Sequence, residues 1–384
     1  MRRKVCVVTG SRAEYGLLRP LLHKFRECDN FCLSLLVTGA HLSGHFGFTS
    51  SEIKRDGFLV TKNIEMLLAS DSPIATSKST GLGIISFAEA YADISPDIVV
   101  LLGDRFEILS AAFPAVIARI PIAHIHGGEA TLGAVDDCIR HSITKMSWWH
   151  FVATEQYRRR VIQLGEHPDR VHTVGGLGID AMLTTDYLTK DELENELGYS
   201  FGEKNLIITL HPTTLEGSSD NMCREMLMAL DSIHNTVFFF TEPNADEGGQ
   251  SIRLLLEEFV TKNKDRAVMI PSMGSRRYLS MLRIVDCMVG NSSSGLTEAP
   301  SFKIGSINIG DRQQGRLKAK SIIDCDPNRN SIRSGIEKVY TKRFQQILKS
   351  VDNPYGVGGA SKKIIEILRT ESLPENIKKE FYDL

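Results

Sequence analysis

The stretch IVVLLGDRFEILSAAFPAVIARIPIAHIHGGEATLGAVDDCIRH, residues 98–141, decides the fold. Two apolar runs within it, 98–102 and 119–125, have the length and composition of buried parallel strands. Polar side chains follow each run at the point where a strand would end. In an open parallel sheet, ligands bind beyond these carboxyl ends. The stretch therefore predicts a doubly wound α/β domain with chemically capable groups along one edge of its sheet.

The polar side chains after the two runs suit proton transfer and anion binding. They are Asp104 and Arg105 after the first run, and His126, Glu129, Asp136, Asp137, Arg140 and His141 after the second. Carboxylates and imidazoles serve as general acids and bases, and guanidiniums bind anions. Asp136 and Arg140 are four residues apart, so a helix would place them on one face. The alternative for that pair is a surface ion pair that only stabilises the helix.

The length of the chain predicts two domains. Its 384 residues exceed the roughly 250–300 that one hydrophobic core sustains. A strand-and-helix pattern runs to a glycine-rich segment near 170–180 and then restarts. We expect two Rossmann-like doubly wound domains, 1–172 and 173–365, followed by a tail, 366–384. Polar clusters follow the apolar runs of both halves, so we expect the two domains to face each other across a cleft.

Composition excludes several classes of partner. The net charge of −2 provides no basic field for nucleic acid or for a membrane surface. No run approaches the roughly 18 apolar residues of a membrane span, and MRRKVCVVTG reads as a first strand, not as a signal peptide. Seven scattered cysteines without a CxxC motif favour free thiols in a reducing cytoplasm.

A second cluster, in the latter half, is typical of phosphate binding. GNSSSG (290–295) follows a predicted strand and offers hydroxyls and helix amides, although it is not a Walker A loop. No GxGxxG follows the first strand, so we expect no dinucleotide. We also expect no other cofactor. Glu298 is placed to accept from a ribose diol. Arginines that would add charge for a diphosphate are Arg12, Arg105, Arg312 and Arg316.

A metal site is not expected. His41 and His45 have the spacing of two ligands on a helix, but Gly44 and Gly47 between and beside them disfavour a helix. The chain also lacks an HExxH frame. The residues alone therefore predict a two-domain α/β enzyme for a nucleotide or a nucleotide sugar.

Eight motifs in order resemble one family. They are GSRAEYG (10–16), GDR (103–105), HIHGGE (124–129), DDCIRHSITK (136–145), HPTT (211–214), PNADEGG (243–249), GNSSSGLTEA (290–299) and GDRQQGR (310–316). Together they resemble the hydrolysing UDP-N-acetylglucosamine 2-epimerases of bacterial sialic acid synthesis, the NeuC type. The resemblance implies the two-domain GT-B-like fold, with 173–365 binding UDP and the tail packing back on the first domain. It also implies a homodimer or homotetramer.

The resemblance implies a reaction. UDP-N-acetylglucosamine and water would give UDP and N-acetylmannosamine, by anti elimination to 2-acetamidoglucal and then hydration with inversion at C2. By match to the family motifs, the catalytic positions are Asp104, His126, Asp136, Arg140 and His211. The matched UDP positions are Arg12, Asn244, Ser292, Ser293, Glu298 and Arg312, to which we add Arg105. Asp180 matches an acid near the sugar, and Glu129 is a further candidate there.

Two positions depart from relatives. Many read HIEGG where this chain has His126, so the proton-transfer role there differs or passes to Glu129 or Asp104; a buried structural histidine is the alternative. Non-hydrolysing relatives carry a lysine where this chain has Leu17, which favours the hydrolysing class. The competing hypotheses are the same chemistry on a UDP-2,4-diacetamido-2,4,6-trideoxy sugar that leads to legionaminic acid, a non-hydrolysing 2-epimerase, a GT-B glycosyltransferase and a non-catalytic UDP-sugar-binding protein.

Overall fold

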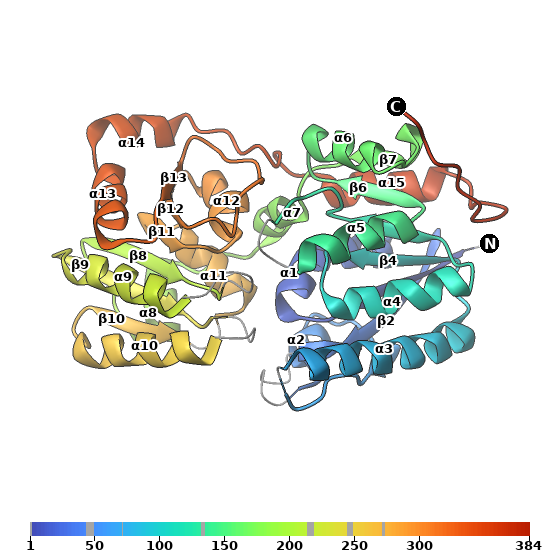
Figure 1. Ribbon diagram of the computed structural model, residues 1–384, viewed down its shortest axis with the longest axis horizontal. Coiled ribbons are helices and arrows are strands. Elements are labelled where there is room, and N and C mark those ends of the chain that lie inside the picture. The colour runs from blue at the N-terminus through green and yellow to red at the C-terminus, as the bar shows by residue number, and fades with distance from the viewer. Residues whose placement is uncertain are drawn as a thin grey trace. The chain divides into compact units, whose positions relative to one another are not determined.

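The computed structural model describes residues 2–43, 50–70, 72–131, 135–212, 219–243, 249–270 and 273–384. The chain forms two compact units, drawn in Figure 1. The N-terminal unit comprises Met1–Glu129, Val135–Thr184 and Tyr355–Leu384, and the C-terminal unit comprises Ala130–Ala134 and Thr185–Pro354. The chain thus leaves the N-terminal unit at 184–185 and re-enters it at 354–355, whereas the sequence placed the boundaries at 172–173 and 365–366.

A parallel sheet of seven described strands forms the centre of the N-terminal unit, in the order β3-β2-β1-β4-β5-β6-β7. The strands are β1 (Arg3–Thr9), β2 (Phe31–Thr38), β3 (Lys62–Ile64), β4 (Ile98–Leu102), β5 (Ile122–Ile125), β6 (Trp149–Val152) and β7 (Val171–Thr173). The strand order reverses between β1 and β4. This switch point is where doubly wound folds bind ligands.

Helices cover both faces of this sheet (Figure 1). One face carries α3 (Pro73–Ile94), α4 (Phe106–Ile117) and α5 (Asp136–Met146), and the other carries α1 (Arg12–Glu27), α7 (Leu177–Thr184) and α15 (Ala360–Thr370). The alternation of side chains along β4 explains the two layers. Val100 packs with α1 and α15, whereas Val99 packs with α3 and α4. The remaining elements are α2 (Ser50–Arg55), α6 (Glu155–Gln163), η1 (Gly39–Leu42) and η3 (Pro168–Arg170).

The C-terminal unit repeats this design with six described parallel strands, in the order β10-β9-β8-β11-β12-β13. They are β8 (Lys204–Thr209), β9 (Thr236–Thr241), β10 (Ala267–Ile270), β11 (Cys287–Gly290), β12 (Gly305–Ile309) and β13 (Ile322–Cys325). The helices are α8 (Lys190–Leu197), α9 (Ser219–Asp231), α10 (Gly249–Lys262), α11 (Gly274–Leu282), α12 (Ser294–Thr297), η4 (Ala299–Phe302), α13 (Arg329–Val339) and α14 (Lys342–Lys349). The order reverses between β8 and β11, which gives this unit a switch point of its own.

The predicted fold class, two parallel α/β sheets flanked by helices, is confirmed, and the structure adds local detail to it. The glycine-rich segment after β7 continues into α7, most of whose residues, including the apolar Leu177, Ile179 and Met182, are buried. Residues 332–350 form two helices, α13 and α14, because the Thr341 hydroxyl accepts from the Phe344 amide at 3.3 Å and starts a new helix there. Short β13 and α8 were not predicted.

The described residues contain neither a membrane-spanning helix nor a cluster of metal ligands. Within those ranges, no helix is both long and apolar enough to cross a membrane. The same ranges contain no group of three or more His, Cys, Asp or Glu side chains placed to hold a metal ion. His45, weighed above as a ligand, lies outside them.

Candidate active site

A buried arginine gathers the predicted acids at the carboxyl edge of the N-terminal sheet. Arg140, on α5, forms an ion pair with Asp104, which follows β4, and lies 3.2 Å from the Asp137 carboxylate. Its Nη1 also donates to the Glu129 carbonyl at 2.8 Å. Because Arg140 is 2% exposed, the surface ion pair considered above is wrong. The Arg140 guanidinium instead joins the segments after β4 and β5 to α5, and the carboxylates around it are able to exchange protons.

The other predicted acid on α5 is Asp136, which is the first residue of the helix and half-buried. Its neighbour Asp137 was not singled out by the motif match. Asp137 contacts both Arg140 and, at 3.5 Å, the imidazole of His141. The sequence analysis paired Arg140 with Asp136 instead; the i,i+3 spacing of Asp137 and Arg140 on a helix is the sequence signal for this contact. The first turn of α5 therefore presents two acids, and Asp137 forms an ion pair with Arg140.

His124 is a residue that the sequence reading missed. It lies fully buried in β5, and its Nε2–H donates to the Gly103 carbonyl at 2.8 Å, next to Asp104. Its Nδ1 lies 3.3 Å from the Thr144 hydroxyl on α5. Burial lowers the pKa of His124 to about 3, so the ring stays neutral. A neutral His124 thus ties the β4 turn to α5 and fixes where Asp104 meets Arg140.

His126 lies at the same edge with an unusual backbone. Its φ is +66°, a left-handed conformation that a non-glycine residue adopts at some energetic cost. The Leu177 amide donates to Nε2 at 3.3 Å, so the neutral ring carries its proton on Nδ1, which lies 3.6 Å from a Glu129 carboxylate oxygen. The two predicted residues therefore form one pair, in which an imidazole proton faces a buried carboxylate.

Two further buried acids, Glu14 and Glu107, lie beside the switch point. Arg105, predicted to bind UDP, directs its Nε to Glu107 at 3.2 Å, and Glu107 is 1% exposed. Glu14, 6% exposed, accepts from the Gly10 amide at 2.7 Å, and its Oε1 is buried without a hydrogen-bond partner among the described residues. Burial, and then the charge of Glu107, raises the pKa of Glu14 to about 8. Glu14 therefore holds a proton at neutral pH.

Arg12 and Asp180, the remaining two predicted residues of this unit, have different surroundings. Arg12 begins α1 directly after β1 and is half-buried, at the switch point where an anion would meet the helix amides. Asp180, predicted to lie near the sugar, caps α15. Its Oδ1 accepts from the Gly359 amide at 2.6 Å and its Oδ2 from the Ser361 amide at 2.6 Å. These bonds satisfy the first turn of α15 and make Asp180 a structural residue.

In the C-terminal unit, Asn291 organises the predicted phosphate loop. Its side chain accepts from the His211 amide at 2.7 Å and donates to the His211 carbonyl at 2.8 Å. Its own carbonyl accepts from Arg312 at 3.2 Å and from Gln313 at 2.8 Å. Burial and the nearby Arg312 charge lower the pKa of His211 to about 3. A neutral imidazole and a guanidinium thus lie together at the switch point of this sheet.

The loop itself follows β11, as predicted. Ser292 and Ser293 lead into the single turn of α12, and both are half-buried. Glu298, at the end of α12, accepts from the Thr297 hydroxyl at 2.6 Å, and burial raises its pKa. Asn244, the remaining predicted UDP residue, lies outside the described residues.

Gly290 allows the two central strands of this unit to approach at the loop. Its φ is +139°, and a Cβ atom there would lie 1.9 Å from the Thr209 carbonyl oxygen. No side chain fits that distance. The position of Asn291, and through it His211 and Arg312, therefore depends on a glycine at 290.

Comparisons with known proteins identify the family of this chain. A sequence profile described as UDP-N-acetylglucosamine 2-epimerase matches residues 23–369. The chain belongs to this epimerase family. It is 42% identical to the GDP/UDP-N,N'-diacetylbacillosamine 2-epimerase (hydrolyzing) of Campylobacter jejuni, covering 100% of both proteins. It is 39% identical to polysialic acid biosynthesis protein P7 of Escherichia coli, covering 100% of this chain and 98% of that protein.

Solved structures agree on the epimerase fold. The crystal structure of UDP-GlcNAc 2-epimerase from Neisseria meningitidis bound to UDP-GlcNAc has a TM-score of 0.84 at 18% identity, covering 96% of this chain and 100% of that one. This likeness confirms the predicted fold. The family profile and the two relatives confirm the resemblance to the hydrolysing UDP-sugar 2-epimerases that the eight motifs indicated.

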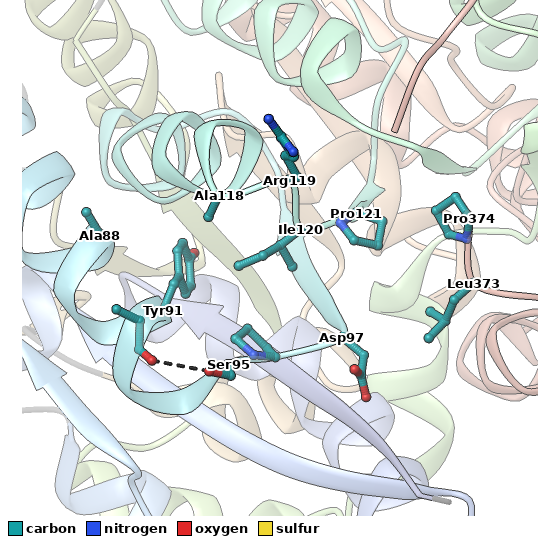
Figure 2. Close-up of a pocket in the computed structure, with 12 residues that line it drawn as sticks. Ala88, Tyr91, Ser95, Asp97, Ala118, Arg119, Ile120, Pro121, Leu373 and Pro374 are labelled. Atoms are coloured by element: carbon teal, nitrogen blue, oxygen red, sulfur yellow. Dashed lines mark hydrogen bonds between the residues drawn. The ribbon is translucent and has the colours of Figure 1, made fainter. Parts of the chain in front are cut away.

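A hollow of about 510 Å³ in this epimerase lies away from the candidate site residues (Figure 2). It is lined by Pro96 and Asp97, which precede β4, by Pro121, which precedes β5, and by Leu373 and Pro374 of the tail. These residues lie at the amino ends of the strands. Because parallel sheets bind ligands at the opposite edge, the hollow is not the candidate active site.

Proposed function

We propose that this protein hydrolyses and epimerises UDP-N-acetylglucosamine, giving N-acetylmannosamine and UDP. The observation that carries the proposal is the pair of carboxylates, Asp104 and Asp137, around buried Arg140 at the switch edge of an epimerase-family sheet. A reaction that removes and returns a proton at carbon needs positioned acids and bases. A protein that merely binds UDP-sugar has no need of such a group, which argues against a sensor.

The proposed chemistry proceeds in two steps. In the first, a carboxylate takes the C2 proton, a C1–C2 double bond forms, and the C1–O bond breaks as UDP leaves with its electron pair. In the second, water adds its oxygen to C1 and a proton returns to C2 on the opposite face. Asp104 and Asp136 are the proposed acid–base residues of these steps. The His126–Glu129 pair, in which the imidazole proton faces a carboxylate, is proposed to handle the proton of the attacking water.

UDP binding is proposed for residues of the C-terminal unit and, from the family motifs, for Arg12. Arg312, His211 and the Ser292–Ser293 loop offer a cation, an imidazole and hydroxyls to a diphosphate. An anion beside His211 would favour protonation of its ring, which can then stabilise the charge on departing UDP. Glu298 is proposed to accept from the ribose diol. No cofactor and no metal are required by these steps.

A second substrate is kept as an alternative because a specific observation favours it. The Campylobacter relative, at 42% identity, is named for diacetylbacillosamine, whereas the Escherichia relative, at 39%, is named for polysialic acid. The alternative is the same elimination and hydration on a UDP-2,4-diacetamido-2,4,6-trideoxy sugar. Its extra acetamido group at C4 lies away from the C1–C2 bond, so the acid–base groups would serve both substrates.

One experiment tests the proposal. The purified protein is incubated in D2O with each of the two UDP-sugars, and the products are followed by NMR. We expect UDP together with free N-acetylmannosamine that carries deuterium at C2. The trideoxy sugar as the faster substrate would select the alternative, and UDP-N-acetylmannosamine as product would select a non-hydrolysing epimerase. If neither sugar is consumed, the proposed activity is wrong.

The Asp104→Asn variant separates chemistry from binding. We expect loss of turnover with retained UDP affinity, since the proposed UDP contacts lie on other residues. Asp29→Asn, at a side chain that is 98% exposed, is the matched control and should keep wild-type activity. Turnover near wild type in Asp104→Asn would remove Asp104 from the mechanism.

We also propose that the protein assembles as a homodimer or homotetramer. Large apolar side chains are exposed on neighbouring helices of the N-terminal unit, namely Ile85 (60%) on α3 and Ile117 (68%) on α4. Such a surface is typical of subunit interfaces. Light scattering of the purified protein gives its mass, and a monomer would refute this assignment.

A further inference from the structure

The tail after α15 is anchored along its length to the N-terminal unit. The Glu371 carboxylate accepts from Trp149 Nε1 at 2.6 Å and lies 3.2 Å from His172 Nε2. Leu373 packs against the core and, with Pro374, lines the hollow seen in Figure 2. Near its end, the Tyr382 amide donates to the Gly165 carbonyl at 3.0 Å. Hydrogen bonds, an ion pair and apolar packing therefore hold the tail on the N-terminal unit.

The most connected residue of the tail is Lys379, which meets a buried carboxylate. Glu166 is fully buried, and Lys379 Nζ lies 2.9 Å and 2.8 Å from its two oxygens. Lys145 Nζ lies 2.6 Å, and His150 Nε2 2.9 Å, from the same carboxylate. Burial raises the pKa of Glu166, but the hydrogen bonds of these three partners outweigh that effect and lower it to about 2. The carboxylate is therefore ionised throughout the physiological range.

Lys379 also binds the C-terminal end of α5, the helix that carries Asp136, Asp137 and Arg140. Its ammonium donates to the Lys145 and Ser147 carbonyls, each at 2.7 Å, at the C-terminus of α5. The last carbonyls of a helix lack partners within it, and a cation there is favoured by the helix dipole. Lys379 thus supplies both the partners and the charge that this helix end requires.

Asp136 and Asp137 lie in the first turn of α5, at its opposite end, and Arg140 follows in the second turn. The helix has 11 residues, and at ~1.5 Å per residue it spans only about 16 Å. A helix of this length transmits a shift of one end to the other as a rigid body. Glu166 fixes Lys145 in the last turn of α5, and Lys379 joins both to the backbone carbonyls at the helix end.

We propose that Lys379 is a positioning residue for the reaction: by clamping the C-terminus of α5 onto Glu166, the tail sets where Arg140 and Asp137 meet Asp104. This inference rests on the proposed function for its activity readout and goes beyond it in assigning a role to the tail. If the proposal is right, loss of the Lys379 ammonium slows the chemical step. UDP-sugar binding stays nearly intact, because the proposed UDP contacts lie elsewhere.

The test is steady-state kinetics of Lys379→Met, Lys379→Arg and Lys378→Met, each normalised to the folded fraction measured by thermal denaturation. Displacing a catalytic group by about 1 Å costs up to about 100-fold in rate, so we expect kcat of Lys379→Met to fall at least about 10-fold while KM changes less than about threefold. Lys379→Arg keeps the charge and the donors and should recover most of kcat. Lys378, exposed on the same tail, is the matched control, and its variant should match wild type.

Two outcomes would overturn the proposal. One is a folded Lys379→Met enzyme with wild-type kcat, which would make the clamp merely structural. The other is a kcat loss that arginine does not rescue, which would show that the ammonium clamp is not the cause. If Lys379→Met does not fold, Lys379→Gln, which keeps a donor without the charge, is measured by the same criteria.

Amide hydrogen exchange gives a readout independent of turnover. The amides of α5 around Arg140 should exchange at least about 10-fold faster in Lys379→Met, while those of α3 stay unchanged. If wild type consumes no UDP-sugar, the proposed function fails, but the exchange result still decides whether Lys379 positions α5. Equal α5 exchange in variant and wild type would refute the positioning role.

Discussion

Glu14 should make the N-terminal unit less stable as pH rises, and Glu14→Gln should remove that dependence. The pKa of Glu14 is raised from 4.5 to about 8, so the folded state binds a proton that the unfolded state releases between those two values. Stability from this proton is fully present below about pH 4.5 and is lost as pH rises through about 8. Glutamine resembles the protonated acid and has no proton to lose.

The structure sets the magnitude. A shift of about 3.5 pKa units at about 1.4 kcal/mol per unit gives an upper limit near 5 kcal/mol. Because Glu14 is 6% exposed, solvent screening reduces this little. We therefore expect the free energy of unfolding of Glu14→Gln, relative to wild type, to rise by roughly 3–5 kcal/mol between about pH 5 and pH 9.

The assay is urea denaturation followed by tryptophan fluorescence. The two tryptophans, Trp148 and Trp149, are adjacent and Trp149 is buried in the core of the N-terminal unit, so the signal reports that unit. The difference between variant and wild type cancels the contributions of other titrating groups, such as His41 and His150. Glu89→Gln, at an exposed position on α3, is the control. A difference for Glu14→Gln that stays constant within about 0.5 kcal/mol across this range would refute the reasoning, because it would mean that Glu14 is ionised throughout.

Two further predictions concern the C-terminal unit. The pKa of His211, about 3 without ligand, should rise by at least about one unit when UDP binds, because a diphosphate would offset the Arg312 charge. An NMR titration of the imidazole with and without UDP measures this pKa. An unchanged pKa would place the diphosphate elsewhere. Gly290→Ala should cost at least about 3 kcal/mol of stability or prevent folding, because its Cβ would meet the Thr209 carbonyl at 1.9 Å. Gly198→Ala, also at positive φ but with open space around the added carbon, should cost only about 1 kcal/mol, and equal losses in the two variants would contradict the steric argument.

The sequence predicted the fold well where periodicity and chemistry agreed. Residues 98–102 and 119–125 are apolar runs followed by polar groups, and both became central strands, although β5 begins only at Ile122. The pattern failed where local composition misled. The glycines at 175–178 suggested a loop, yet the apolar side chains after them pack as α7. Short edge strand β13 lacked a long apolar run.

The candidate site was predictable in its residue types but not in its pairings. Sequence spacing relates Arg140 to Asp137 on one helix, whereas its ion pair with Asp104 joins positions 36 residues apart and depends on the strand order. The position of Asp180 matched a family acid, but a capping role depends on where α15 begins, which a motif does not show. His124 and Asn291 act through backbone carbonyls and amides, so only coordinates reveal them.

The division of the chain between the units has a consequence for synthesis. The N-terminal unit needs Tyr355–Leu384, which includes α15 and the anchored tail, whereas all of Thr185–Pro354 is made before those residues. During translation, the C-terminal unit therefore has its own contiguous core available first, while the earlier-made strands of the N-terminal unit leave the α15 face of their sheet uncovered. The exposed face in that interval includes Val5, Val100 and Trp149. The nascent protein is thus most open to chaperone binding and aggregation in the half that was made first.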